Sequence, residues 1–311
     1  MRVLLTSAGT STCVNLIKYL KKMEDYVVVT DINTYGFTAG SLLAEKYYQV
    51  PLAVEEEFIE VLNEIILIEN IELLIPVNDI EVYICAKAIN KIKCQCLVPE
   101  ASTIENISDK YICSTQMRNI GIMVPEILEA DNIAIERILR DRKGVGSKGI
   151  NFLETGEKCW EYSKHKSFLQ KRIVNGREYT VDVLADKNGI PIYIVPRERL
   201  EVKNGVATKV YISEDNQLIS FAKTILQEYK LPGFSNIQFI KDENENYWFI
   251  EINYRFSGCG AATLAVCPDY LAKFKGIIRN MAYSTLLNEN VKWGSVVTRY
   301  YEEVVYEESV C

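Results

Sequence analysis

The 311-residue chain has a single histidine, His165, and this scarcity excludes a large class of enzymes. A Ser-His-Asp or Cys-His catalytic set would have to use that one side chain. His165 lies between Lys164 and Lys166 in a polar stretch, which is typical of a solvated surface residue rather than of a general base. We therefore expect chemistry that does not depend on histidine acid–base catalysis.

An excess of basic residues is also missing. The chain has 35 basic and 42 acidic residues and a net charge of −7, so we expect no nucleic-acid partner. No apolar run is long enough to cross a bilayer, and Met1 leads directly into the strand-like Val3–Leu5, so we expect neither a membrane partner nor a secretory signal. The nine scattered cysteines then indicate a reducing, cytoplasmic location. Cys94-x-Cys96 lacks the second pair that a zinc site needs.

Two glycine-rich nucleotide fingerprints are absent as well. The first loop, Ser7–Ser11, lacks the three glycines of the dinucleotide-binding motif, which disfavours a nicotinamide-dependent oxidoreductase. The loop Gly144–Gly149 is not a Walker A loop, because no Gly-Lys-Thr/Ser ending follows it.

The first hundred residues alternate between strand-like and helix-like segments. Such alternation, with continuously apolar strands, predicts a parallel sheet covered on both faces. Ligands bind such sheets at the carboxyl ends of the strands, although polar residues there serve equally well as helix caps. The predicted strands are 2–5, 26–30, 72–76 and 95–98, the helices 14–22, 56–68 and 80–92, and the polar residues at strand ends Ser7, Gly9, Asp31, Asn78, Asp79 and Glu81.

The rest of the chain reads as hairpins with fewer helices, so we predict an α/β protein whose C-terminal part is α+β. Asp109 or Ser108 can cap a helix that ends at Gly121. Turn residues at Asn175-Gly176, Lys187–Gly189 and Asp242–Asn246 separate the strands that follow. We predict strands at 137–140, 168–173, 178–184, 191–195, 235–241, 247–252 and 296–301, and helices at 217–228 and 270–283.

The segment Glu251–Gly258 carries the strongest chemical signal. Alternate side chains of a strand share a face, so Glu251, Asn253 and Arg255 are predicted to project together while the apolar residues between them point into a core. A carboxylate, an amide oxygen and a guanidinium suit a Mg²⁺–phosphate site, because Mg²⁺ prefers oxygen ligands and arginine binds phosphate oxygens. An exposed polar sheet face with a Glu–Arg pair is the alternative. The carbonyl of Gln238, on the neighbouring hairpin strand, could add a metal contact.

The loop Gly144–Gly149 is the second element. Its glycines, Gly144 and Gly146 among them, would let backbone N–H groups approach phosphate oxygens, and Lys148 would add charge together with Arg140 or Arg142. Taken alone, the same sequence would also suit a plain surface loop.

In combination these segments resemble the ATP-grasp superfamily, in particular its carbamoyl-phosphate-synthase-large-subunit-like branch. The resemblance covers nearly the whole chain. It implies a pre-ATP-grasp Rossmann-like domain at residues 1–107, a lid subdomain at 108–175 and a C-terminal catalytic subdomain at 176–311. The motifs that carry it, in family order, are Pro76–Glu81, Asp109-Lys110, the loop Gly144–Gly149, Gly176–Asp182, Pro196–Leu200, and Gln238 with Glu251-x-Asn253-x-Arg255.

The resemblance also implies roles for individual residues, with ATP and one or two Mg²⁺ ions as cofactors and Mn²⁺ as an alternative metal. Gln238, Glu251 and Asn253 would hold the metal on the phosphates. The catalytic set would be Arg255 on the transferred phosphoryl group, Arg197 and Arg199 facing the acyl phosphate or substrate carboxylate, and Lys148. The nucleotide-binding set would be Lys110, Arg140, Gly144, Gly146, Ser147, Gln170, Lys171, Ile173, Glu178, Gln238 and Glu251.

Two departures from the family pattern affect the lid. The stretch from Pro125 to Arg140 is short, so part of a helix is expected to be missing. Arg140-Asp141 stands where the family pattern has lysine-proline at the end of the lid strand. Lys171 stands where the family pattern has a glutamate in the hinge.

The expected function is a Mg-ATP-dependent ligase that joins a small carboxylate to an amine. Two alternatives stay open: phosphorylation of carbamate or bicarbonate, as in carbamoyl-phosphate synthase, and a non-catalytic nucleotide-binding subunit. Biotin carboxylase is disfavoured by the absence of a visible biotin link. The resemblance leaves a homodimer open, and the acid and the amine cannot be read from the sequence.

Overall fold

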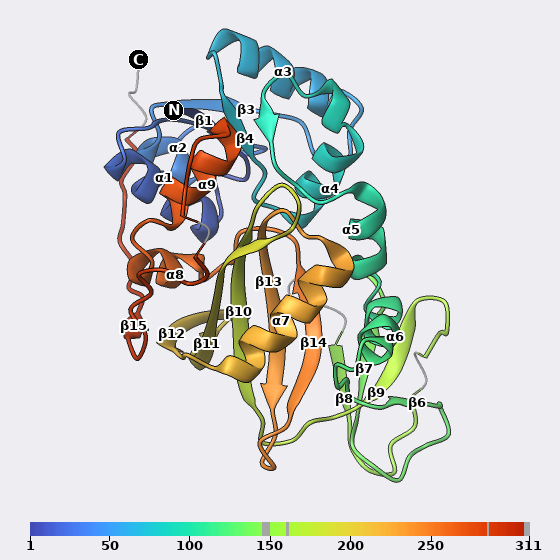
Figure 1. Cartoon of the computed structure of the whole chain (residues 1–311). Coiled ribbons are helices and arrows are strands. Elements are labelled where there is room, and N and C mark those ends of the chain that lie inside the picture. The colour runs from blue at the N-terminus through green and yellow to red at the C-terminus, as the bar shows by residue number, and fades with distance from the viewer. Residues whose placement is uncertain (145–149, 160–161, 285, 308–311) are drawn as a thin grey trace.

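The computed structural model describes residues 1–144, 150–159, 162–284 and 286–307 (Figure 1). Its strands form a five-stranded, a six-stranded and a four-stranded sheet. In Figure 1 the five-stranded sheet lies above the six-stranded one, and the four-stranded sheet stands at the lower right. The loop residues Gly146, Ser147 and Lys148, to which the resemblance gives phosphate contacts, lie outside the described residues.

The N-terminal sheet is parallel throughout, as the alternation of strands and helices predicts. Its strand order is β3-β2-β1-β4-β5. Side chains at odd positions of β1, such as Val3 and Leu5, pack toward α1, whereas Leu4 packs toward α3. Apolar strands buried on both faces explain why their sequences do not alternate. The elements are β1 Arg2–Leu5, β2 Tyr26–Asp31, β3 Lys46–Gln49, β4 Leu73–Ile75, β5 Gln95–Cys96, α1 Ser11–Lys22, α2 Ala39–Leu43, α3 Phe58–Ile68 and α4 Asp79–Lys87.

The central sheet is antiparallel and has the order β14-β13-β10-β11-β12-β15. Apolar side chains of β10, β13 and β14 pack with those of α7 on one face (Figure 1). Part of the other face shares a core with α1, α8 and α9. The elements are β10 Arg177–Ala185, β11 Pro191–Lys203, β12 Val206–Ile212, β13 Gly233–Lys241, β14 Tyr247–Asn253, β15 Val296–Thr298, α7 Asn216–Tyr229, α8 Gly260–Val266 and α9 Tyr270–Arg279.

The third sheet, called the lid sheet below, has the order β6-β9-β7-β8 and a small core of its own. The helices α5 and α6 precede it, and Asp109 caps α6 by accepting hydrogen bonds from the N–H groups of Tyr111 and Ile112, as the sequence predicts. The elements are α5 Ala101–Ser108, α6 Lys110–Asn119, β6 Ile127–Leu128, β7 Arg137–Asp141, β8 Ile150–Leu153 and β9 Ser167–Lys171.

The α/β fold class with an antiparallel C-terminal part is confirmed. The three sheets fall in residues 2–96, 127–171 and 177–298, and we retain the divisions at 107/108 and 175/176 as a proposal. The sequence pattern did not predict α2, α5, α8, β3, β6, β8 or β12, which are mostly short. Among the described residues, no helix combines the length and the apolar character needed to cross a bilayer.

The central sheet, α9 and the segment after β14 meet in an aromatic cluster. The ring centroids of Phe234 and Phe274 lie 4.2 Å apart, and Phe256 and Tyr270 pack against Phe234. Near the amino terminus, Asp25 accepts from the terminal ammonium and from Lys275 of α9. These contacts join elements that lie far apart in the sequence.

We predict that Phe274→Ala lowers the free energy of unfolding by about 3–5 kcal/mol, because the substitution empties a buried aromatic site. Phe274 is 2% exposed, whereas Phe37 is 77% exposed, so Phe37→Ala is the matched control and should change stability by less than about 0.5 kcal/mol. Urea denaturation of both variants measures the difference. Equal losses would contradict the placement of Phe274 in the core.

Candidate active site

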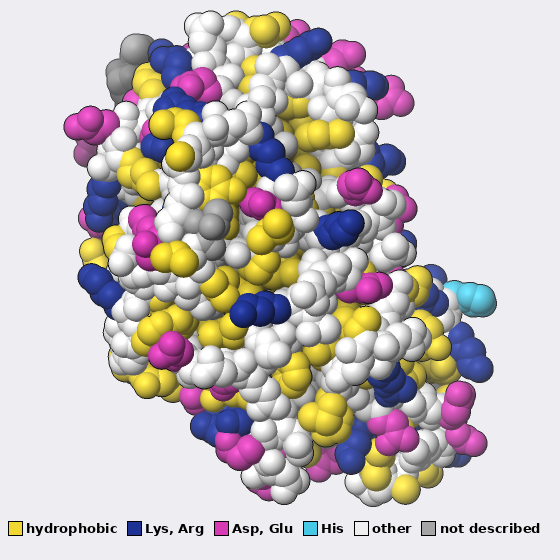
Figure 2. All heavy atoms as spheres, in the orientation of Figure 1, with side chains coloured by type: hydrophobic (Ala, Val, Ile, Leu, Met, Phe, Trp, Pro, Cys, Tyr) yellow, Lys and Arg dark blue, Asp and Glu magenta, His cyan; other side chains and the backbone are white. Residues whose placement is uncertain are grey.

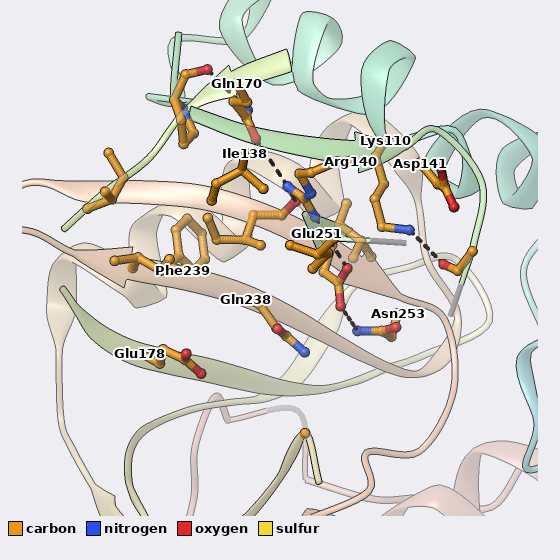
Figure 3. Close-up of a pocket in the computed structure, with 18 of the residues that line it drawn as sticks. Lys110, Ile138, Arg140, Asp141, Gln170, Glu178, Gln238, Phe239, Glu251 and Asn253 are labelled. Carbon is orange, nitrogen blue, oxygen red and sulfur yellow. Dashed lines mark hydrogen bonds and ion pairs between the residues drawn. The ribbon is translucent and has the colours of Figure 1, made fainter. Parts of the chain in front are cut away.

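A cavity of about 850 Å³ lies where the central sheet faces the lid sheet. Its walls include residues of β7–β9, β13 and β14, together with residues of α4, α5 and α6. Figure 3 shows polar side chains from several of these elements pointing into the same space. In Figure 2 the single histidine projects from the edge of the molecule, and His165 is exposed, as predicted.

The acidic end of the cavity depends on an irregularity in β14. In a regular strand, residues 249, 251 and 253 would share one face. Here Gln238 pairs with Glu251 but Phe239 pairs with Phe249, so Ile250 is an extra residue, as in a β-bulge. Phe249 therefore points into the core beneath α7 while Glu251 lines the cavity. Because of the bulge, Glu251 lies on the opposite face of the sheet from Phe249, although the two residues are two positions apart.

Gln238, Glu251 and Asn253 form one cluster on that face (Figure 3). Gln238 and Glu251 are direct neighbours across the two strands. The amide of Asn253 donates to Glu251 Oε1 at 3.4 Å. Amide and carboxylate oxygens gathered in this way fit the ligand preference of Mg²⁺.

Two cations border this cluster (Figure 3). The Nη2 atom of Arg140 lies 3.6 Å from Glu251 Oε2, and its Nη1 donates to Ile250 O and to Gln170 Oε1 at 3.3 and 3.2 Å. Burial lowers the pKa of Arg140, but a guanidinium stays charged in proteins. Lys110 donates to the carbonyl of Gly144 at 2.6 Å, and burial lowers the pKa of its ammonium.

The lid side of the cavity combines apolar and amide groups. Ile138 of β7 and Ile173, which follows β9, line it there, and Phe239 of the central sheet also lines the cavity. Gln170 is buried, and its amide donates to the carbonyl of Pro125 at 3.1 Å while its oxygen accepts from Arg140. Such a slot can take a flat, largely apolar ring with polar edges. Lys171 lines the cavity too, although its side chain is exposed.

Arg199 and Glu178 line another stretch of the wall and pair with each other. Arg199 Nε lies 3.2 Å from Glu178 Oε2, and its Nη2 donates to Gly205 O at 2.8 Å. Val202 and Gly205 of the β11–β12 hairpin also line the cavity. The sequence pattern gave no sign of this hairpin contribution, because the region from 200 to 209 shows neither a motif nor a predicted strand.

Comparison with known protein families finds two matches along the chain. Residues 3–98 match the PylC-like N-terminal domain, and residues 164–274 match an ATP-grasp domain of a biosynthetic pathway with the Ter operon. These segments hold the parallel sheet and the Gln238, Glu251 and Asn253 cluster, respectively. The similarity to the ATP-grasp family therefore lies in residues 164–274.

Two curated relatives of this chain are larger proteins. Biotin carboxylase 2 of Bacillus subtilis is 23% identical over 188 residues, which are 50% of this chain and 42% of the relative. The carbamoyl phosphate synthase large chain of Agathobacter rectalis is 26% identical over 179 residues, 52% of this chain and 16% of the relative. The chain therefore spans less than half the length of either protein.

Solved structures share the fold of almost the whole chain. A biotin carboxylase complex from Campylobacter jejuni has a TM-score of 0.73 at 17% identity, covering 95% of this chain and 74% of that one. An N5-carboxyaminoimidazole synthetase from Staphylococcus aureus, complexed with ADP, also has a TM-score of 0.73, at 15% identity, covering 91% and 78%. At these identities the likeness concerns the fold.

Most of the residues predicted for the ATP-grasp site lie together. The predicted residues that line the cavity are Lys110, Arg140, Gly144, Gln170, Lys171, Ile173, Glu178, Arg199, Gln238, Glu251 and Asn253. Sequence reasoning missed, among other lining residues, Tyr83, Glu105 and Ser108 of α4 and α5, because no motif marks them as site residues.

Arg255 does not project with Glu251 and Asn253 as predicted. The strand β14 ends at Asn253, so the alternation of faces does not extend to Arg255. Its Nε donates to Asp79 Oδ2 at 2.8 Å, at the amino end of α4, and the side chain is not part of the cavity wall. Asp79 itself lines the cavity, so Arg255 stands directly behind that wall.

Arg197 is not on the cavity wall either, contrary to the prediction that it faces a substrate. It is 2% exposed, and its guanidinium donates to Asp182 at 2.8 Å and to Ser257 Oγ at 2.7 Å. Thr263 donates to the same carboxylate. A buried guanidinium paired with a buried carboxylate has a structural role, and here its bond to Ser257 fixes the segment that follows Arg255.

We predict that Arg197→Met lowers the free energy of unfolding by about 3–5 kcal/mol, because it leaves Asp182 as an uncompensated buried charge. Replacing both partners, in Asp182→Leu/Arg197→Met, should restore part of that loss. Thermal and urea unfolding measure both variants. A single variant as stable as the wild type would show that the buried pair does not hold this region together.

Proposed function

We propose that this chain is a Mg-ATP-dependent ligase that activates a carboxylate as an acyl phosphate for attack by an amine. The products would be a C–N bond, ADP and phosphate. The observation that carries the proposal is the cluster of Gln238, Glu251 and Asn253, facing Lys110 and Arg140 across one cavity. Metal-ligating oxygens beside paired cations suit a metal-bound polyphosphate.

The cofactors in this proposal are ATP and one or two Mg²⁺ ions, with Mn²⁺ as an alternative. Gln238, Glu251 and Asn253 would hold the metal, which neutralises phosphate charge when bound. Lys110, Arg140 and Gly144 would contact phosphates, and Gln170, Lys171 and Ile173 would border the base. Glu178 would lie toward the ribose. Solved structures of similar fold are complexes with ADP or with MgADP, which supports this assignment.

The first chemical step needs little from the protein beyond position and charge. An ionised carboxylate oxygen would attack the γ-phosphorus, the bond to the β,γ-bridging oxygen would break, and ADP would leave. No general base is required, which agrees with the exposed position of His165. The amine would then attack the acyl carbon, losing a proton as phosphate departs. Arg140 and Arg199, which line the cavity, and Arg255 behind its wall would supply positive charge around these anions.

Phosphorylation of carbamate or bicarbonate is the second candidate. The similarity to biotin carboxylase and to the carbamoyl phosphate synthase large chain favours it. One related structure, a 2-oxoglutarate carboxylase domain dimer from Hydrogenobacter thermophilus, is described with bicarbonate as well as MgADP. That description also supports a homodimer for this chain.

The described cysteines are all unpaired, which supports a reducing, cytoplasmic environment.

We predict that Glu251→Gln lowers Mg-ATP turnover by roughly a hundredfold or more, because it removes the one carboxylate of the proposed metal cluster. ADP release is measured with pooled carboxylates and amino acids, and with bicarbonate, to separate the two candidates. Glu245→Gln, an exposed acid in the turn of the same hairpin, is the control and should keep wild-type turnover. Full activity in a folded Glu251→Gln variant would contradict the metal assignment.

The affinity for MgADP should fall as the pH rises toward the usual lysine pKa of about 10.4. Burial lowers the pKa of Lys110, so its ammonium loses its charge at a lower pH than an exposed lysine does. Loss of one charged phosphate contact corresponds to roughly a tenfold weaker binding. In Lys110→Arg the guanidinium stays charged, so the decline should disappear. Titration calorimetry across this pH range tests the point, and identical profiles for both proteins would contradict it.

A further inference from the structure

We propose that Asp79 is a positioning residue that orients Arg255 toward the γ-phosphate end of the nucleotide. The proposal rests on the ATP-dependent function proposed above. Asp79 and Arg255 are 176 positions apart in the chain, and the carboxylate of the one accepts from Nε of the other at 2.8 Å. This ion pair directly joins the N-terminal domain to the segment that follows the metal-ligand strand.

The carboxylate of Asp79 is not used to cap its own helix. Asn78 accepts from the N–H of Ile80 and forms a capping box with Glu81. Asp79 is the first residue of α4, where the helix dipole stabilises a negative charge. It is 7% exposed and belongs to the cavity wall. The carboxylate is therefore nearly buried at the cavity wall, and its described hydrogen-bond partner is Arg255 rather than the backbone of its own helix.

The start of α4 is itself held firmly. The Glu81 carboxylate accepts from the hydroxyls of Thr6 and Ser7 at 2.6 and 2.8 Å. It also accepts from the N–H of Asn78 at 3.1 Å. These bonds tie the amino end of the helix to the loop after β1. The backbone of Asp79 is therefore held in place, which a residue needs if it is to orient another side chain.

The backbone around Arg255 is fixed independently of Asp79. The amide of Asn236 donates to the carbonyl of Arg255 at 3.2 Å, and Arg197 holds Ser257 two residues further on. The side chain has two described bonds, from Nε to Asp79 and from Nη1 to the carbonyl of Phe256 at 3.3 Å. Within the described part of the chain, Nη2 has no hydrogen-bond partner, and the proposal gives this atom to the phosphate.

The expected effect of Asp79 is preorganisation. A guanidinium already held in one plane loses less conformational freedom when it binds an anion than a free arginine side chain does. Because this proposal places Arg255 at the γ-phosphate end, the benefit should appear with a nucleotide triphosphate and not with a diphosphate. The alternative is that the ion pair with Asp79 competes with the phosphate for Arg255. In that case Asp79→Asn would bind the triphosphate more tightly than the wild type does.

The experiment compares the dissociation constants of Mg–β,γ-imido-ATP and MgADP by titration calorimetry. Asp79→Asn keeps the size of the side chain and one acceptor oxygen but removes the charge. We expect it to weaken triphosphate binding about tenfold and to leave MgADP binding unchanged. Arg255→Gln should weaken triphosphate binding at least as much. The double variant should be no weaker than Arg255→Gln alone, because the two residues act as one unit.

Glu72→Gln is the matched control, since Glu72 also makes a long-range ion pair at 2.8 Å, with Arg279, away from the cavity. It should leave both dissociation constants unchanged. Three results would overturn the role of Asp79: Asp79→Asn binding both nucleotides like the wild type, binding the triphosphate more tightly, or losing both nucleotides equally. If the wild type bound neither nucleotide, the proposed function itself would fail and the role of Asp79 with it.

Discussion

The architecture of the site depends on the pairing of Glu251 with Gln238 across two antiparallel strands, displaced by the extra residue Ile250. Without that bulge, the face that carries Phe249 into the core would also carry Glu251. A carboxylate cannot be buried in an apolar core without a partner, so the strand could not serve both purposes. The bulge resolves the conflict, and it also directs the Ile250 carbonyl to Arg140 of the lid sheet. The central sheet and the lid sheet thus meet at the proposed metal-binding cluster of Gln238, Glu251 and Asn253.

Each part of the chain contributes a different chemical group to the cavity. The central sheet supplies the oxygen cluster, the lid sheet and α6 supply Arg140 and Lys110, and α4 supplies Asp79. Behind the wall, the buried Arg197–Asp182 pair fixes the chain after β14 without touching the cavity. Removing one partner of a buried pair is costly, so this arrangement favours one conformation of that segment. The site is therefore a property of the assembled fold rather than of any one sheet.

Local sequence patterns predicted the parallel sheet, the hairpins and the cluster around Glu251 and Asn253, because periodicity and turn residues specify these features within a few positions. They failed where the outcome depends on partners distant in the sequence. The alternation of faces was extended to Arg255, although the strand ends before it. The family resemblance implies a substrate contact for Arg197, and the sequence gives no sign that this side chain is instead paired with Asp182. The bulge at Ile250 is visible only once the register is known.

The most direct test of the account is a crystal structure with Mg²⁺ and β,γ-imido-ATP. The account predicts a metal ion within roughly 2.0–2.2 Å of oxygens of Glu251 and Asn253, with Gln238 in the same cluster and the base between the lid sheet and the central sheet. A triphosphate bound outside this cavity, or a metal that contacts none of the three side chains, would contradict it.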